Sequence, residues 1–215
     1  RMNPGRVILR NILAAGFPAE AVTVVKPGTS EVEGCLAVPG LEALPGRVDL
    51  LVLSLGAEAA PAAVEEVVER AAAEAVILIP GGLGEREGSA ALAERLSAAI
   101  AAGRRRGDGP VVNGGNSMGV RSLPGRYDAT FIPRYKSSPD PSAPSVPLAV
   151  LSQSGAFAIA RLDRLVGLRP RYLVTLGNQA DVTAGDYLAC LQDDPATEVF
   201  ACYLEGFQPG DGARC

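Results

Sequence analysis

The 215-residue sequence predicts an α/β protein, with a Rossmann-like half followed by a second half that also carries a parallel β-sheet. Apolar β-branched runs alternate with amphipathic Ala-rich stretches, and the alternation restarts after a Pro- and Ser-rich interruption. This β-α-β rhythm implies parallel strands joined by right-handed crossovers. Ligands bind such sheets at the carboxyl ends of the strands, so the turns at those ends are the positions to search.

The composition excludes several classes of function. The chain contains no histidine, which rules out Ser-His and Cys-His nucleophile pairs and HExxH zinc sites within these residues. A net charge of −4, no Trp and 5% aromatic residues argue against nucleic-acid binding. Four cysteines without a CxxC pair predict free thiols in a reducing cytoplasm and no metal site. No apolar run reaches the roughly 18 residues of a membrane span.

The first half is expected to begin with a helix. Asn3 is a good N-cap, Pro4 fits the first helical position, and Gly16 can end the helix. The elements that follow are strands at 21–25, 48–55, 75–79 and 111–112 and helices at 61–73 and 89–102. The run at 48–55 is almost continuously apolar, as expected for a strand buried on both faces.

A linker is expected at 134–147, because this segment holds four prolines and four serines. It would separate a domain at 1–133 from a domain at 148–215. In the second domain we expect strands at 148–151, 172–175 and 199–204 and helices at 156–166 and 184–192. Three strands are few for an open α/β sheet, so this domain is expected to be incomplete.

The first helix and first strand offer positions for a phosphorylated cofactor. Asn3 and Gly5 open the helix, where amides and the positive end of the helix dipole can hold a phosphate, although plain capping explains them too. Lys26 follows the strand at 21–25, where an NAD-binding fold would carry an acidic residue. A lysine there suits the 3′-phosphate of CoA or the 2′-phosphate of NADP.

Two later turns in the first half are built from small residues. Ser54 and Leu55 end the run at 48–55, and Gly81 and Gly82 follow the next strand. Small residues let a ligand approach the backbone, although ordinary tight turns explain them equally well.

The second half carries a stronger signal, in LSQSGA. Ser152, Ser154 and Gly155 lie where a strand runs into a helix, so that hydroxyls and amides can form an anion site; a double serine N-cap is the alternative. Asp181 follows the next strand and is a candidate helix cap. Glu205 ends the last strand and either faces a cleft or lies on the surface.

These turns, in this order, resemble the nucleoside-diphosphate-forming acyl-CoA synthetase superfamily, which includes ADP-forming acetate–CoA ligases and the alpha subunit of succinyl-CoA synthetase. The matching segments are MNPGRVILRNIL, VVKPG, VDLLVLSL, NGGNSMG, LSQSGAFA, LGNQADV and DDPATEVFACYLEGF. The resemblance implies a CoA-binding Rossmann-like domain followed by a flavodoxin-like ligase domain. Members of the family also have a strand and Gly-rich turn before the first helix and a relay histidine after the EGF segment. Neither is visible here, so we expect the sequence to be a fragment.

The resemblance also implies roles for single positions. Those that match CoA-contacting turns are Asn3, Gly5, Lys26, Ser54, Leu55, Gly81, Gly82 and Asn116. Gly115 replaces the proline of the family's Gly-Pro-Asn turn. Ser152 and Ser154, with Gly155, match the start of the helix that holds the transferred phosphate. Glu205 matches a glutamate that pairs with the phosphohistidine.

The implied reaction converts acyl-CoA, phosphate and ADP into acid, CoA and ATP, through an acyl phosphate and a phosphohistidine outside this chain. ADP or ATP with Mg would bind an ATP-grasp module, in a partner subunit or a fused domain. We expect a cytoplasmic oligomer that binds neither nucleic acid nor membrane. Two alternatives stay open. One is a non-catalytic CoA-binding regulatory module, and the other is an NADP-dependent oxidoreductase, although the sequence lacks GxGxxG.

Overall fold

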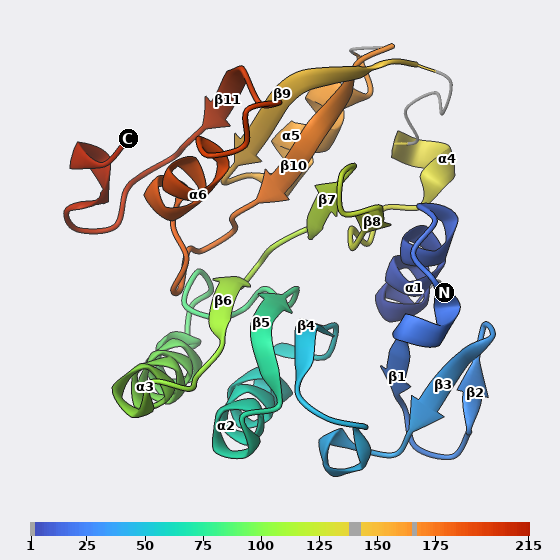
Figure 1. The fold of residues 1–215 in the computed structure, drawn as a ribbon. Coiled ribbons are helices and arrows are strands. Elements are labelled where there is room, and N and C mark those ends of the chain that lie inside the picture. The colour runs from blue at the N-terminus through green and yellow to red at the C-terminus, as the bar shows by residue number, and fades with distance from the viewer. Residues whose placement is uncertain (1–2, 138–142, 165–166) are drawn as a thin grey trace.

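A computed structural model describes residues 3–137, 143–164 and 167–215 (Figure 1). Its first helix, α1 (Pro4–Ala14), begins and ends as predicted. The Gly5 amide donates a hydrogen bond of 2.9 Å to Oδ1 of Asn3, which is the N-cap. Gly16 follows the helix with a φ of 92°, a value that glycine adopts without strain.

The first half contains two separate three-stranded sheets rather than one continuous sheet. One has the order β1-β3-β2, from β1 (Thr23–Val25), β2 (Glu31–Val32) and β3 (Cys35–Val38). The other has the order β4-β5-β6, from β4 (Val48–Leu53), β5 (Ala73–Leu78) and β6 (Val111–Gly114). Pairing is parallel except between β2 and β3. The alternation of strands and helices in the sequence therefore predicted parallel pairing correctly, but the sequence analysis did not predict strands β2 and β3.

Helices α2 (Ala60–Arg70) and α3 (Ala90–Arg106) pack against each other beside the β4-β5-β6 sheet (Figure 1). The core between these layers contains Val64, Val67, Leu78, Leu96 and Val112. The strand at 48–55 packs against apolar clusters on both faces, as expected, with Leu51 on one side and Leu50 and Val52 on the other, but most of its residues are only half-buried. β4 is an edge strand of its sheet, and Leu53 is its only buried residue.

The second half contributes to a five-stranded sheet with the order β11-β9-β10-β7-β8. Its parallel strands are β9 (Ser145–Ser152), β10 (Arg169–Thr175) and β11 (Val199–Tyr203). Two short antiparallel strands extend this sheet from the first half of the chain, β7 (Val120–Ser122) and β8 (Tyr127–Asp128). The two halves of the sequence therefore share one sheet.

Helices α5 (Gly155–Leu162) and α6 (Ala184–Leu191) complete the second half close to their predicted positions. Two parts of the predicted linker have regular structure, because α4 covers Arg134–Ser137 and β9 begins at Ser145. Residues 138–142 of that linker, and the end of the predicted helix at 165–166, lie outside the described residues. The domain boundaries themselves stay a prediction.

A buried cluster joins the two halves. It combines Ile8 of α1, Ile77 of β5 and Val120 of β7 with Leu151 of β9 and Leu176 after β10. Because these residues come from both halves of the sequence, the halves bury apolar surface against each other and should unfold together.

Polar contacts reinforce this junction. Asp181 accepts two hydrogen bonds from Arg104 of α3, at 2.8 and 2.9 Å, and one of 2.8 Å from the Val112 amide. It therefore links the second half to the first instead of capping the following helix. That cap is Thr183, which forms a capping box with Asp186.

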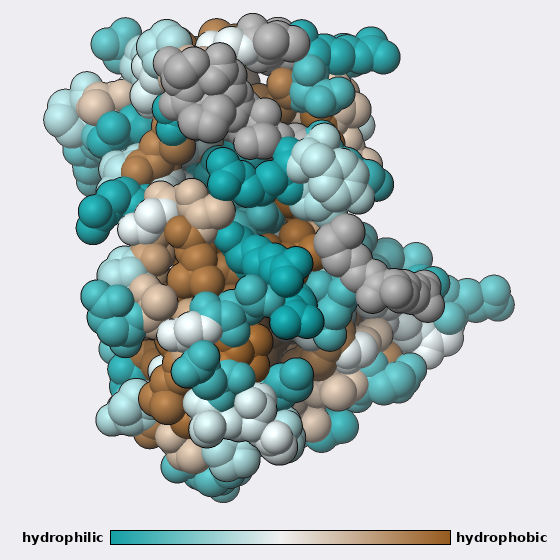
Figure 2. Space-filling model, turned by 90° about the vertical axis from the view of Figure 1, so that its right-hand side faces the viewer, coloured by the Kyte–Doolittle hydropathy of each residue, from teal (hydrophilic) through white to brown (hydrophobic). Residues whose placement is uncertain are grey.

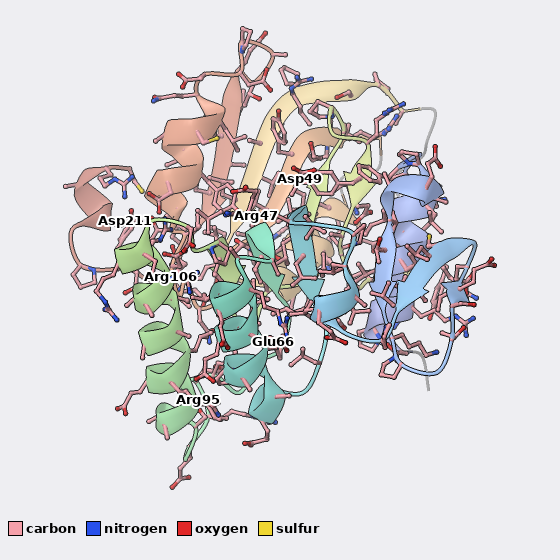
Figure 3. All side chains as sticks on the ribbon, turned by 60° about the horizontal axis from the view of Figure 1, so that its bottom comes forward. Arg47, Asp49, Glu66, Arg95, Arg106 and Asp211 are labelled. Atoms are coloured by element: carbon pink, nitrogen blue, oxygen red, sulfur yellow. The ribbon has the colours of Figure 1, made fainter. Side chains whose placement is uncertain are left out.

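The surface carries ion pairs and scattered apolar residues. Arg95 of α3 pairs with Glu65 of α2, and Arg70 pairs with Glu66 within α2. Figure 3 labels Arg95 and Glu66 on these two helices. Such exposed pairs contribute little to stability. On the face shown in Figure 2, apolar areas lie among hydrophilic side chains. Among the described helices, none combines the length and apolar character needed to cross a membrane.

Because the buried cluster is shared, we expect a substitution within it to destabilise both halves of the chain together. Leu151 is fully buried, so Leu151→Ala should lower the free energy of unfolding by about 2–5 kcal/mol. Leu36→Ala is the control, because Leu36 is 53% exposed. Urea unfolding of both variants, followed by circular dichroism, measures the effect. Two separate transitions, of which only one shifts in Leu151→Ala, would contradict a core shared by both halves.

Candidate functional site

The first group of predicted residues meets where α1 begins. A Cβ atom placed on Gly5 would lie 3.7 Å from both Cβ and Oγ of Ser54, in the turn after β4, and 3.4 Å from Oδ1 of Asn3. The start of α1 therefore lies beside the Ser54 side chain. Leu55, by contrast, packs against the core of the first half.

A second group surrounds the turn after β5. A Cβ atom on Gly81 would lie 2.7 Å from Oδ1 of Asn116 and 2.9 Å from Oε1 of Glu85. Gly82 has a φ of 90°, and a Cβ atom there would lie 3.2 Å from Cβ of Ala57. Because Ala57 follows the Ser54 turn, the first two groups lie next to each other along one edge of the sheet.

Glu85 is part of this second group, although the sequence did not single it out. Its carboxylate accepts hydrogen bonds from the Gly82 amide, from the Leu83 amide at 2.9 Å and from Nδ2 of Asn178 at 2.8 Å. Partial burial acts to raise the pKa of Glu85, but these donors outweigh it and bring the pKa below its usual 4.5. The side chain is therefore an anchored anion that links the turn after β5 to the turn after β10.

The turn after β10 closes the site from the second half. Its amides at Asn178 and Ala180 donate to the carbonyls of Gly115 and Gly114, at 2.8 and 2.7 Å. A Cβ atom on Gly177 would lie only 2.0 Å from the Gly115 oxygen, so only glycine fits there. The NGGNSMG loop is thus held by the second half even though glycine replaces the expected proline.

The LSQSGA segment forms the predicted strand-to-helix turn. Ser152 is buried and its hydroxyl donates to the Ser154 carbonyl at 2.6 Å. The Ser154 hydroxyl accepts a hydrogen bond of 3.3 Å from the Phe157 amide and so caps α5. A hydroxyl that accepts keeps its own proton, so Ser154 can still donate to a ligand. A Cβ atom on Gly155 would lie 2.7 Å from Cβ of Met118, which brings this turn against the NGGNSMG loop.

Glu205 lies near this turn because Gln153 fixes its backbone. Oε1 of Gln153 accepts hydrogen bonds from the amides of Glu205 and Gly206, at 2.8 and 3.1 Å. The Glu205 side chain is exposed and pairs with no described residue. Its carboxylate is therefore free to face a partner group.

Lys26 is the predicted residue that the structure leaves apart. It is exposed at the end of β1, and its amide donates to the Val38 carbonyl at 2.7 Å. Its side chain makes no hydrogen bond or ion pair with the described residues. It belongs to the β1-β3-β2 sheet, whereas Ser54 and Gly81 follow strands of the other sheet.

Sequence reasoning missed three residues that organise the site. Gln153 and Asn178 lie inside LSQSGA and LGNQAD, so the motifs marked their turns but not their hydrogen bonds. Glu85 lies three residues beyond Gly82 in a charged surface loop, where no local pattern separates an anchored carboxylate from a solvated one.

Comparison with known proteins identifies the families that the two halves match. Residues 1–121 match the family of CoA binding domains, and residues 145–213 match the succinyl-CoA ligase like flavodoxin domain. The fold class and the family resemblance predicted from the sequence are therefore confirmed.

Individual relatives agree with these matches. The chain is 29% identical to the alpha subunit of ADP-forming acetate–CoA ligase I from Pyrococcus furiosus, over 96% of this chain and 44% of the relative. It is 30% identical to ADP-forming acetate–CoA ligase I from Archaeoglobus fulgidus, over 96% of this chain and 28% of the relative. The chain thus spans less than half the length of these curated relatives.

A solved structure extends the similarity to the whole described fold. The dinucleotide forming acetyl-coenzyme A synthetase 1 of Ca. Korarchaeum cryptofilum, in complex with phosphate and ADP, aligns with a TM-score of 0.82 and 30% identity. The alignment covers 99% of this chain and 43% of that chain.

The anchored Glu85 predicts a pH-dependent contribution to stability. Its pKa in the folded protein lies below 4.5, so this contribution is complete above that pH and disappears as the pH falls through the lowered pKa. Glu85→Gln should therefore lower stability at pH 7 by roughly 1 kcal/mol, a value limited by solvent exposure. Thermal melts between pH 2.5 and about 7 measure the difference. Glu87→Gln is the matched control, and equal effects of the two substitutions would rule out a special role for Glu85.

Proposed function

The chain belongs to the family of CoA-binding domains, and on this basis we propose that it forms the CoA-binding portion of an ADP-forming acyl-CoA synthetase. The observation that carries the proposal is the position of the segment after β4, which lies beside the start of α1 at Ser54 and beside the turn after β5 at Ala57. Gly5 in the first turn of α1, and Ser54, Gly81 and Gly82 in the two turns, fall within the residues that match the CoA-binding family.

The residues at these turns fit a CoA ligand. Gly5 is half-buried beside Ser54 and carries no side chain that would block a ligand at the start of α1, whereas Gly82 is buried and its amide is bound to Glu85. We assign the CoA-binding role to Asn3, Gly5, Lys26, Ser54, Gly81, Gly82 and Asn116. Leu55 contributes through its backbone, because its side chain packs into the core.

Phosphate would bind at the start of α5. The amides of the first turn and the Ser154 hydroxyl can donate to an anion that also benefits from the positive end of the helix dipole. Ser152 would support this site through the turn, because its hydroxyl is committed to the Ser154 carbonyl. Glu205 would pair with a phosphohistidine that this chain does not contain.

The whole reaction would need parts beyond these residues. Phosphate would displace CoA from the acyl group, and a histidine would then pass the phosphoryl group to ADP with Mg on an ATP-grasp module. That module would be a partner subunit or a fused domain, in a cytoplasmic oligomer. Phosphoryl transfer depends mainly on positioning and on neutralising charge, which helix N-termini and hydroxyls supply.

A regulatory CoA-binding module is the second candidate. The match to the CoA-binding family is compatible with a chain that senses CoA as well as with one that serves a ligase. Activity measured together with an ATP-grasp component separates this candidate from the ligase.

Calorimetric titration of the chain with CoA tests the proposal, with NADPH as the control ligand. We expect CoA to bind and NADPH neither to bind nor to compete.

Lys26→Ala should weaken the binding of CoA more than that of dephospho-CoA, because a lysine at this position suits the 3′-phosphate. Lys136→Ala is the control and should change neither affinity. An equal loss for both ligands would place Lys26 away from that phosphate.

The role of the α5 turn is tested by Ser154→Ala in the assembled enzyme. Removing one donor to the phosphate should slow phosphate-dependent turnover by about tenfold or more, while CoA affinity stays within about twofold. Turnover at varied phosphate concentration, together with CoA titration, measures both effects. A large defect in CoA affinity with normal turnover would show that this turn serves CoA instead of phosphate.

A further inference from the structure

The loop between Gly82 and Ser89 is shaped by two of its own side chains. Glu85 is bound to the Gly82 and Leu83 amides, as described above. The Ser89 hydroxyl, which is 7% exposed, accepts from the amides of Gly84 and Arg86 at 3.0 and 3.2 Å and donates to the Arg86 carbonyl at 2.6 Å. The backbone of Arg86 is therefore fixed from both sides.

This loop places the Arg86 side chain against the turn after β5. The position that a Gly82 Cβ would occupy lies 3.5 Å from Cδ and 3.8 Å from Nη1 of Arg86. The same position lies 3.2 Å from Cβ of Ala57, in the segment that follows Ser54. Arg86 thus borders the turns that we assign to CoA.

The Arg86 guanidinium has no counterion in the part of the chain that the structure describes. Its neighbour Glu85 is turned away toward the Gly82 and Leu83 amides and Asn178. Most other arginines near helices α2 and α3 pair with carboxylates, as Arg95 and Arg104 do. Arg86 is an exposed cation at the edge of the turn after β5, and such a cation is suited to bind an external anion.

We propose that Arg86 binds a phosphate group of the CoA nucleotide and so contributes to selectivity for the phosphorylated cofactor. The inference rests on the proposed function. The planar guanidinium can donate two parallel hydrogen bonds to one phosphate, which a lysine cannot do. The phosphate is either the 3′-phosphate or the diphosphate of CoA, and both share this chemistry.

Arg86→Gln tests the inference, with Arg105→Gln as the matched control. Arg105 is also exposed and without a counterion among the described residues, but it lies at the end of α3. We expect Arg86→Gln to weaken CoA about tenfold and to reduce the salt dependence of binding, with Arg105→Gln within about twofold of wild type. Calorimetry measures affinity, and thermal melts establish that both variants fold.

Binding of CoA, dephospho-CoA and pantetheine to Arg86→Gln identifies which phosphate of CoA the Arg86 side chain contacts. A loss for CoA and not for dephospho-CoA points to the 3′-phosphate, and an equal loss for both points to the diphosphate. Pantetheine carries no phosphate, so its affinity should not change in Arg86→Gln. An unchanged CoA affinity, or an equal loss for pantetheine, overturns the inference while leaving CoA binding by the wild type intact. If the wild type binds no CoA, the proposed function fails and the inference fails with it.

Discussion

The close approach of two turns, Gly114–Asn116 and Gly177–Ala180, is the constraint on which the rest of the structure depends. Two backbone hydrogen bonds join them, and the Gly115 oxygen occupies space that any side chain at position 177 would fill. This contact brings the strand ends of both halves to one place. The pairing of β7 with β10 and the shared apolar cluster lie beside it and bury the surface that keeps the halves together.

Carboxylates strengthen the same junction while leaving cations available. Asp181 of the second half accepts hydrogen bonds from Arg104 and the Val112 amide of the first half. Glu85 of the first half accepts one from Asn178 of the second half. Both acids are satisfied by donors within the protein, so neither opposes an anionic ligand as strongly as a free carboxylate would. Arg86 lies next to Glu85 in sequence, yet its charge is not neutralised by it.

The serines of the α5 turn show how one residue type serves two roles. Ser152 is buried and donates its hydroxyl proton to the Ser154 carbonyl, so it stabilises the turn. Ser154 accepts the capping hydrogen bond and keeps its proton. In the sequence, capping and anion binding are alternative explanations of LSQSGA. In the structure, Ser154 can cap α5 and still donate to an anion, whereas the hydroxyl proton of Ser152 is already committed within the turn.

The sequence alone determined the local features: the Asn3 cap, the alternation of parallel strands with helices, the motif turns and the family that they resemble. These follow from side-chain chemistry and spacing within a few residues. Only the tertiary structure decided that β7 and β8 join the second sheet, that β4 is an edge strand, and that Glu85 reaches Asn178. Those features depend on strand edges and hydrogen-bond partners far apart along the chain, and no local pattern encodes which edge or donor a residue will meet.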